Sequence, residues 1–376
     1  MRLGFDAKRA FSNETGLGNY SRDTIRILSS FFSQNKYFLY TPKKIKSPRT
    51  FFIEEKENIF VRTPESLINK TLRSYWRSFS IVKDIFTNNI DIFHGLSNEL
   101  PIGIEKTSIK SIVTIHDLIF IRYPSLFKSI DRRIYYKKSK SACLRANKII
   151  AVSEQTKKDI IDYFNISEKK IEVVYQGCNK IFQKQLTIES KNYVNKKYFL
   201  PKSYLLYVGT IEERKNLLTL LKALREIPDQ KLVVIGNGNG KEYMIKCKKY
   251  ISENNLENRV IFISNLLLEE MAAIYQSAEI MIYPSIFEGF GIPILEALFS
   301  KTPVITSKGG CFSEAGGPHS MYVNPLNEKE IENAIIKISK SQLIKEKMIN
   351  EGFSYAQNFT DKNIATNLFK VYKDLK

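Results

Sequence analysis

The feature that most restricts the fold is a regular alternation of short apolar runs and longer helical patterns along the whole chain. Strands that alternate with helices predict parallel sheets covered by helices on both faces, so we expect an α/β fold. The runs expected to form strands are 2–7, 37–41, 58–63, 91–96, 111–117, 148–153 and 171–177 in the first half, and 204–210, 231–237, 260–264, 279–285 and 303–307 in the second.

The length of the chain predicts two domains. A chain of 376 residues is long for a single hydrophobic core. The alternation pauses in a polar stretch at 184–202 and then resumes, which predicts two doubly wound, Rossmann-like domains at residues 1–190 and 203–358. A final helical pattern at 361–375 is assigned to a separate segment, 359–376.

The composition is that of a folded, cytoplasmic protein. Hydrophobic residues make up 43% of the chain, enough for substantial cores, and no run approaches the length of a membrane-spanning helix. The first residues resemble a strand and not a signal peptide. The four cysteines have no paired spacing for zinc or redox chemistry, which fits a reducing compartment. They are Cys143, Cys178, Cys247 and Cys311.

The stretch that follows strand 279–285 is the most informative about chemistry. Pro293 is placed to begin a helix, because its fixed φ and missing N–H suit the first helical turn. Amides bared by glycines and by a helix N-terminus can bind an anion, and carboxylates can accept hydrogen bonds from sugar hydroxyls. We predict a ligand that is part phosphate and part sugar; the alternative is an ordinary surface loop before an amphipathic helix. The contacts expected are Glu288, Gly289, Phe290, Gly291, Ile292 and, in the first helical turn, Glu296.

Two glutamates separated by seven residues within FEGFGIPILEAL resemble the signature of glycosyltransferase family 4, the group 1 glycosyltransferases that include mannosyltransferase-like bacterial surface-glycan enzymes. The resemblance implies the GT-B fold, with two Rossmann-like domains facing each other across a cleft and a terminal helix that crosses back onto the first domain. It also implies retaining transfer from a nucleotide-diphosphate sugar. In such an enzyme Glu296 would bind the ribose and Glu288 the hydroxyls of the sugar.

Further donor contacts are expected from the second domain. Arg214 and Lys215 stand where a helix begins after strand 204–210, and two cations there can neutralise a leaving diphosphate. The alternative is a pair of exposed cations. Many family members carry Arg directly after the strand glycine, where this chain has Thr210, so the number of cations on the diphosphate stays open. The other expected donor contacts are Gly209, Gly236, Gly238, Asn265 and Leu266.

The first domain contains residues that we expect to contact the acceptor, and two glycines that we expect to contact the donor. Gly16 and Gly18 follow the first strand and could approach a phosphate, although a plain tight turn explains them equally well. His94 and His116 end strands, and open α/β sheets bind ligands beyond the carboxyl ends of their strands. His116 resembles the family's histidine beside the transferred sugar, whereas a structural role is an equal alternative for His94. The acceptor contacts expected are Asn19, Tyr20, His94, His116 and Asp117.

The net charge of +19 is concentrated in the first half, where residues 1–190 carry 33 Lys and Arg against 19 Asp and Glu. Basic, aromatic-containing segments at 67–86 and 127–140 predict contact with an anionic membrane surface. The alternative is that their apolar faces pack on the sheet while the charges meet water. The cations expected at the membrane are Lys70, Arg73, Arg77, Arg132, Arg133, Lys137 and Lys138.

These observations predict a retaining glycosyltransferase in surface-polysaccharide assembly, at the inner face of the plasma membrane. It would move a hexose from GDP-mannose or a UDP-sugar to a hydroxyl of a glycan or a polyprenyl-diphosphate-linked saccharide. No metal or other cofactor is expected, because no Asp-x-Asp pattern occurs and cations can replace a metal. The alternatives are a nucleic-acid-binding protein, prompted by the charge, and another GT-B enzyme such as a sugar-nucleotide epimerase or a phosphorylase. The predicted catalytic residues are Glu288, His116, Arg214 and Lys215.

Overall fold

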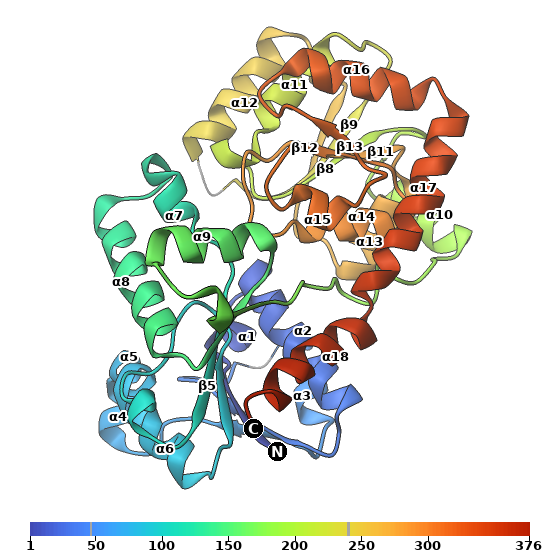
Figure 1. Cartoon of the computed structure of the whole chain (residues 1–376). Helices are drawn as coiled ribbons and strands as arrows, with labels where there is room; N and C mark the ends of the chain where they lie inside the picture. The colour runs from blue at the N-terminus through green and yellow to red at the C-terminus, as the bar shows by residue number, and fades with distance from the viewer. Residues whose placement is uncertain (46, 239–240) are drawn as a thin grey trace. The chain divides into compact units, whose positions relative to one another are not determined.

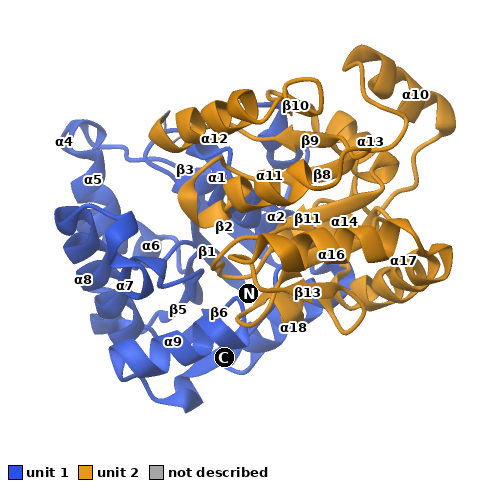
Figure 2. Cartoon of the chain, turned by 90° about the horizontal axis from the view of Figure 1, so that it is seen from above, with its two compact units in different colours: residues 1–177, 361–376 blue, residues 178–360 orange. Residues whose placement is uncertain are grey.

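The computed structural model describes residues 1–45, 47–238 and 241–376. The chain forms two compact units, coloured separately in Figure 2. Unit 1 comprises Met1–Gly177 and Asp361–Lys376, and unit 2 comprises Cys178–Thr360. Each unit is built on a parallel sheet that helices cover, so the predicted α/β, doubly wound architecture is confirmed.

Unit 1 contains a seven-stranded sheet in the order β3-β2-β1-β4-β5-β6-β7, with every pair parallel. Each strand overlaps a run that the sequence predicts, because strands buried on both faces are apolar at nearly every position, although β2 and β5 each begin one residue earlier, at a lysine. The strands are β1 (Arg2–Asp6), β2 (Lys36–Tyr40), β3 (Ile59–Arg62), β4 (Ile92–Gly95), β5 (Lys110–Ile115), β6 (Lys148–Ala151) and β7 (Ile171–Val173).

Helices cover both faces of this sheet (Figure 1). Successive side chains of a strand point to opposite faces. Val113 of β5 accordingly packs into a core with Ile85 and Cys143, whereas Thr114 contacts Tyr20 on the other side. The helices are α1 (Lys8–Ser12), α2 (Gly16–Phe31), α3 (Phe51–Glu54), α4 (Leu67–Thr71), α5 (Arg73–Tyr75), a π-helical turn (Trp76–Ser80), α6 (Ile81–Thr87), α7 (Ile119–Arg122), α8 (Ser129–Arg145), α9 (Glu154–Phe164) and α18 (Asp361–Lys373).

The last helix, α18, is part of unit 1 although it follows unit 2 in the sequence. It packs along α2, where Arg26 binds both carboxylate oxygens of Asp361 at 2.6 and 3.1 Å. The rings of Phe32 and Phe369 stack with centroids 3.8 Å apart. A charge pair at one end and a ring stack near the other therefore hold the helix on unit 1.

Unit 2 contains a six-stranded parallel sheet in the order β10-β9-β8-β11-β12-β13. Its strands are β8 (Leu205–Val208), β9 (Leu232–Ile235), β10 (Val260–Ile263), β11 (Ile280–Tyr283), β12 (Val304–Ser307) and β13 (Met321–Val323). The short edge strand β13 is not among the predicted runs. Its helices are α10 (Ile188–Lys197), α11 (Leu217–Arg225), α12 (Lys241–Glu253), α13 (Leu268–Ser277), α14 (Ile292–Phe299), α15 (Phe312–Gly316), α16 (Glu328–Ser339) and α17 (Gln342–Ala356).

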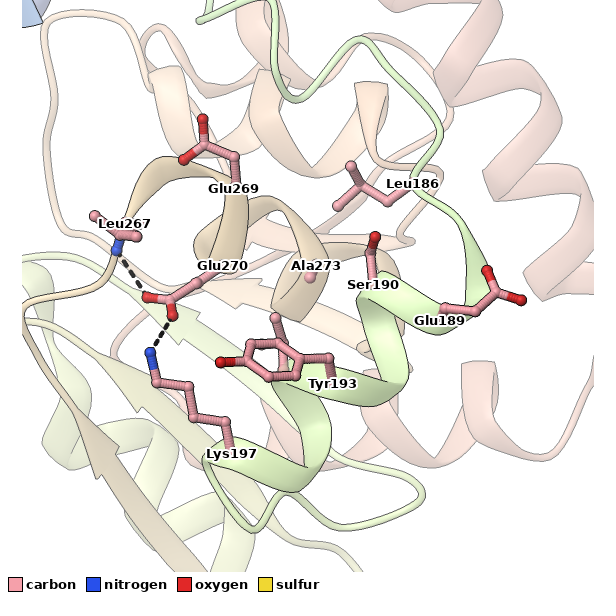
Figure 3. Close-up of a pocket in the computed structure, with 10 residues that line it drawn as sticks. Leu186, Glu189, Ser190, Tyr193, Lys197, Leu267, Glu269, Glu270 and Ala273 are labelled. Carbon is pink, nitrogen blue, oxygen red and sulfur yellow. Dashed lines mark hydrogen bonds and ion pairs between the residues drawn. The ribbon is translucent and has the colours of Figure 1, made fainter.

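The boundary between the units differs from the prediction, because unit 2 begins at Cys178 and not after a linker at 184–202. Helix α10 lies in that polar stretch and packs on α13 (Figure 3). Glu270 of α13 ties the two helices together, accepting bonds from Lys197 at 2.5 Å and from the hydroxyl of Tyr198 at 2.9 Å. The polar composition at 184–202 thus reflects an exposed helix that is held by a few buried contacts.

The strand orders define where each unit is expected to bind ligands. In an open α/β sheet, ligands bind beyond the carboxyl ends of the strands, at the point where the strand order reverses. That point lies between β1 and β4 in unit 1, and between β8 and β11 in unit 2. Loops that leave these four strands are therefore the places to look for a site.

The terminal helix yields a test of how unit 1 is held together. The hydroxyl of Tyr372 lies 2.6 Å from Nδ1 of the buried His94. Tyr372→Phe should destabilise the protein by about 1–3 kcal/mol, because a buried ring nitrogen loses its partner. Urea denaturation followed by circular dichroism measures this. Tyr193→Phe on α10, where the side chain is 66% exposed, is the matched control and should change stability by less than about 0.5 kcal/mol.

Candidate functional site

A buried ion-paired cluster occupies the switch point of unit 2. Arg214 and Lys215 lie in the loop after β8, and Glu288 lies in the loop after β11. Glu288 Oε1 is 2.7 Å from a guanidinium nitrogen of Arg214 and 2.6 Å from Nζ of Lys215. Ser285 donates its hydroxyl to the same oxygen at 2.5 Å. The structure therefore brings together three of the four residues that the sequence predicts to be catalytic.

The cluster keeps Glu288 ionised. Burial alone would raise the pKa of Glu288, but the charges of Lys215 and Arg214 outweigh it and lower this pKa to about 2. Burial lowers the pKa of Lys215 by more than Glu288 raises it. Burial also acts to lower the pKa of Arg214, but the charges of Glu288 and Glu212 outweigh burial and raise it. At neutral pH Glu288 is thus a carboxylate that cannot donate a proton.

Neighbouring groups fix the direction of both cations. Arg214 donates to the carbonyl of Phe287 and to Glu212, both at 2.6 Å. Lys215 donates to the hydroxyl of Tyr283 at 2.6 Å. Each cation therefore has a protein partner besides Glu288, which limits how far it can move.

Close packing of the backbone at the ends of β8 and β9 helps to position the loop that carries the two cations. A Cβ atom on Gly236 would lie 2.0 Å from the carbonyl oxygen of Gly209, so only glycine fits where the ends of β8 and β9 meet. The methylenes of Lys215 lie against Gly209, 3.6 Å from where its Cβ would be. Gly209 thus lies beside Lys215 and Gly236 packs against Gly209, so the role that the structure gives both glycines is steric, and their contact with a donor stays a prediction.

Glu296 lies on α14, but not in its first turn as predicted. The helix begins at Ile292 with Gly291 as its N-cap, and Glu296 is the fifth residue. Its side chain is buried and accepts a hydrogen bond from the hydroxyl of Tyr275 at 2.9 Å. The correction arises because Pro293 is the second helical residue and not the first.

The remaining predicted donor contacts lie in the loops that follow β9, β10 and β11. Gly289 and Phe290 join Glu288 to α14, and the ring of Phe290 is buried against Phe359. Gly238 follows β9 and packs against Met244. Asn265 and Leu266 form the loop after β10, where Asn265 has a left-handed φ of 59°.

In unit 1 the structure defines the state of His116. Its Nε2 lies 2.9 Å from the carbonyl oxygen of Leu96, so Nε2 carries the proton, and Nδ1 accepts from Gln176 at 3.2 Å. Burial lowers the pKa of His116 to about 4. The imidazole is therefore neutral at pH 7, with both nitrogens bonded to protein groups.

His94 and Tyr20 have structural positions, which favours the structural alternative for His94 and corrects the assignment of Tyr20 to the acceptor. Both are buried, and both bind the hydroxyl of Thr114, His94 through Nε2 at 2.7 Å and Tyr20 through its hydroxyl at 2.9 Å. Tyr372 occupies the other nitrogen of His94. Burial lowers the pKa of His94 to about 3 and raises the pKa of Tyr20 to about 12. The ring of Tyr20 meets His116 edge-on at 4.6 Å.

The loop before α2 is held by its own polar groups. Gly18 donates its N–H to Oδ1 of Asn13, and a Cβ at Gly18 would lie 1.9 Å from the carbonyl oxygen of Asn13. This N–H is thus engaged by protein, contrary to the expectation that it faces a phosphate. Gly16 is the first residue of α2 and has open space around it, while Asn19 is exposed and accepts from Arg22 at 2.6 Å.

Two further predicted residues of unit 1 have well-defined contacts. Asp117 lies after β5 and accepts the N–H of Ile119 at 3.1 Å, which leads the chain into α7. Arg77, expected at the membrane, is instead buried at the switch point of unit 1. It binds both oxygens of Asp6 and one oxygen of Glu99. The prediction for Arg77 is wrong, because a strand-end carboxylate and a loop carboxylate take up its charge.

Several residues of these clusters are absent from the prediction. Ser285, Tyr283 and Tyr275 lie in or beside apolar stretches, so nothing in their spacing marks them. Glu212 could have been found, because a carboxylate two residues before Arg214 is a natural partner for it. Gln176 lies at the end of a predicted strand, and nothing in the sequence marks it as the partner of His116.

Among the described residues, no group of three His, Cys, Asp or Glu side chains is placed to hold a metal ion. No helix in the described parts of the chain is both long and apolar enough to cross a bilayer.

The fold is of the GT-B type. The structure of HepE from Anabaena in complex with UDP-glucose superposes with a TM-score of 0.79 and 16% identity, and the match covers 100% of both chains. At this identity the similarity shows the fold.

Sequence comparison then gives the family. Residues 38–180 match glycosyltransferase family 4, and residues 191–355 match glycosyl transferases group 1. The chain is 30% identical over 268 residues to the O-antigen chain mannosyltransferase RfbU of Salmonella typhimurium, which covers 71% of this chain and 69% of that protein. It is 26% identical over 288 residues to O-antigen chain mannosyltransferase B of Escherichia coli, covering 75% and 74%. The protein belongs to the group 1 glycosyltransferases, as the sequence motifs indicate.

The ionised Glu288 predicts an acid-sensitive site. A carboxylate whose pKa is lowered on folding stabilises the protein above its unfolded pKa and loses that effect as pH falls through the folded value. We expect Glu288 to contribute roughly 3 kcal/mol at pH 7, lost between about pH 4.5 and pH 2. Denaturation midpoints across this range should fall steeply for wild type and less steeply for Glu288→Gln. Glu269→Gln, an exposed carboxylate on α13, should follow wild type.

Proposed function

We propose that the protein transfers a hexose, with retention of configuration, from a nucleotide-diphosphate sugar to a hydroxyl of a glycan or lipid-linked saccharide. The observation that carries this proposal is the convergence of Arg214 and Lys215 on Glu288 at the switch point of unit 2. Mannose is the favoured sugar, because the relatives at 30% and 26% identity are named mannosyltransferases. GDP-mannose and a UDP-sugar both fit the site chemistry.

The two cations would carry the charge that develops on the departing diphosphate. Charge grows on the phosphate oxygens as the glycosidic bond breaks, and preorganised donors in a buried site stabilise it without reorganising. Guanidinium and ammonium groups held by Glu212, Tyr283 and Phe287 are preorganised in this sense. In this proposal they take the role that a metal ion has in other transferases.

Glu288 would have two partners in turn. Three of its bonds converge on Oε1, and the hydroxyl of Tyr283 also interacts with the carboxylate. In this proposal a hydroxyl of the sugar binds the carboxylate at Oε2. Before the donor binds, the same carboxylate occupies both cations, so an arriving diphosphate must compete with it for them. We therefore propose that the donor shares Arg214 and Lys215 with Glu288, while Glu296 on α14 binds the ribose.

A thermal-shift series with GDP, UDP and a short oligonucleotide tests the donor class. A ligand at about 100 times its Kd should stabilise the protein by roughly 2.7 kcal/mol. We expect a rise in Tm with one nucleoside diphosphate and none with the oligonucleotide. Stabilisation by the oligonucleotide alone would contradict the proposal and support nucleic-acid binding.

Because Glu288 is proposed to compete with the diphosphate and Glu296 is not, substitutions of these two residues should affect nucleotide binding differently. Glu288→Gln removes the carboxylate that competes for the cations, so it should bind GDP or UDP as tightly as wild type or more tightly, yet transfer sugar at least about 100-fold more slowly. Glu296→Gln should weaken nucleotide binding by about tenfold or more, because it loses a charged acceptor for the ribose. Calorimetric titration and a transfer assay measure both, with Glu269→Gln as control. Weaker nucleotide binding by Glu288→Gln would contradict the competition.

We also propose that unit 1 associates with an anionic membrane through α4 and α5. Leu67 and Ile68 are 82% and 70% exposed, and Leu72 is 54% exposed. Lys70 lies between them in sequence and Arg73 follows Leu72, and neither cation forms an ion pair among the described residues. Apolar side chains interleaved with cations suit the interface of an anionic bilayer, where each cation contributes about 1 kcal/mol.

Vesicle co-sedimentation tests this association. Binding should need anionic lipid and fade as salt rises. The triple variant Leu67→Ser, Ile68→Ser, Leu72→Ser should bind about tenfold more weakly or worse. Leu267→Ser, Leu326→Ser, Leu343→Ser, which changes three exposed leucines of unit 2, is the matched control and should bind as wild type. Equal binding to neutral vesicles would contradict the proposal.

A further inference from the structure

Unit 1 contains a surface cavity of about 350 Å³ between α7 and α8. Its apolar lining comes mainly from α7 and the turn after it, where Phe120, Ile121 and Pro124 lie. The ring of Tyr136 from α8 adds to this lining. The cavity therefore presents a hydrocarbon surface of a few side chains, enough for part of a chain or ring system.

Three cations line the same cavity from α8, namely Arg132, Arg133 and Lys137. None of them forms an ion pair with any described residue, whereas the adjacent Lys138 pairs with Glu99 at 3.3 Å. Arg133 and Lys137 are four residues apart on one helix, where like charges repel each other. An anion bound among the three would remove this repulsion, so the charge arrangement is complementary to a phosphate group.

We propose that this cavity binds one molecule of a phosphate-bearing lipid, with the phosphate between Arg132, Arg133 and Lys137. The first carbons of the lipid chain would lie against Phe120, Ile121 and Pro124. A bare phosphate would leave the apolar lining exposed, and a neutral lipid would leave the cations unpaired. A lipid phosphate satisfies both parts of the cavity.

The topology of unit 1 connects this cavity with the carboxyl ends of its strands. Helix α7 starts two residues after Asp117, in the segment that leaves β5 and carries His116. A lipid held by α7 and α8 would thus have its headgroup on elements that continue from the edge where the acceptor is expected. This step rests on the proposed function, in which the acceptor saccharide is carried by a lipid.

Calorimetric titration with dihexanoyl phosphatidic acid, kept below its critical micelle concentration, tests the site without donor or sugar transfer. We expect one lipid per chain. 1,2-Dihexanoylglycerol, which has the acyl chains without the phosphate, and inorganic phosphate should each bind at least about tenfold more weakly, because each satisfies only one half of the cavity. The variant Arg132→Gln, Arg133→Gln, Lys137→Gln should lose about 100-fold in affinity for the lipid phosphate.

A matched variant separates the site from general charge attraction. Lys106→Gln, Lys110→Gln, Lys158→Gln removes the same charge from exposed positions of unit 1 and should bind the lipid phosphate within about twofold of wild type. Equal losses in the two variants, or inorganic phosphate binding as tightly as the lipid, would overturn the site. Tighter binding of a short oligonucleotide with the same dependence on the three cations would also overturn it. Because no nucleotide sugar is present, these outcomes do not depend on whether the donor assignment holds.

Discussion

The ion-paired cluster of Arg214, Lys215 and Glu288 is the interaction that joins the loops at the switch point of unit 2, and the proposed function rests on it. Two charges taken out of water are stable only with well-placed partners, and here one carboxylate oxygen serves two cations and a hydroxyl. The loop after β8 and the loop after β11 are consequently locked to each other. This locking fixes the approach to α14, and with it the position of Glu296.

The parallel sheets explain why such clusters form where they do. In unit 2 the cluster joins the loops after β8 and β11, and in unit 1 Arg77 joins Asp6 at the end of β1 to Glu99 after β4. Both pairs of strands flank the point where the strand order reverses. Charged groups gather there because the loops diverge and leave room above the sheet edge. Only in unit 2 does the family resemblance assign a substrate to the cluster.

Most strands of both sheets could be predicted because buried parallel strands are apolar throughout. The motif around Glu288 could be recognised because its glycines and proline are residues that the backbone requires at a turn and at the start of a helix. The edge strand β13 was not predicted, because only Val323 of its three residues is fully buried and polar residues flank it, so it does not stand out as an apolar run. The role of Arg77 was misjudged, and that of His94 was left open between a structural and an acceptor role, for a different reason. Their partners Tyr372 and Asp6 are far from them in sequence, so no local pattern shows that these polar side chains are already satisfied. The inclusion of α10 in unit 2, which begins at Cys178, was hidden for the same reason, because the bond between Lys197 and Glu270 spans a long stretch of chain.

The attachment of α18 to unit 1 has a consequence for biosynthesis. Because this helix follows unit 2 in the sequence, a ribosome must complete all of unit 2 before the partner of His94 emerges. Until then, the face of unit 1 formed by α2 lacks its covering helix, and Phe32 has no aromatic partner from α18. The nascent first unit is therefore incomplete for the whole time that the second is being made. Folding quality control has a defined interval in which to bind that uncovered face, and the interval closes when the last helix docks.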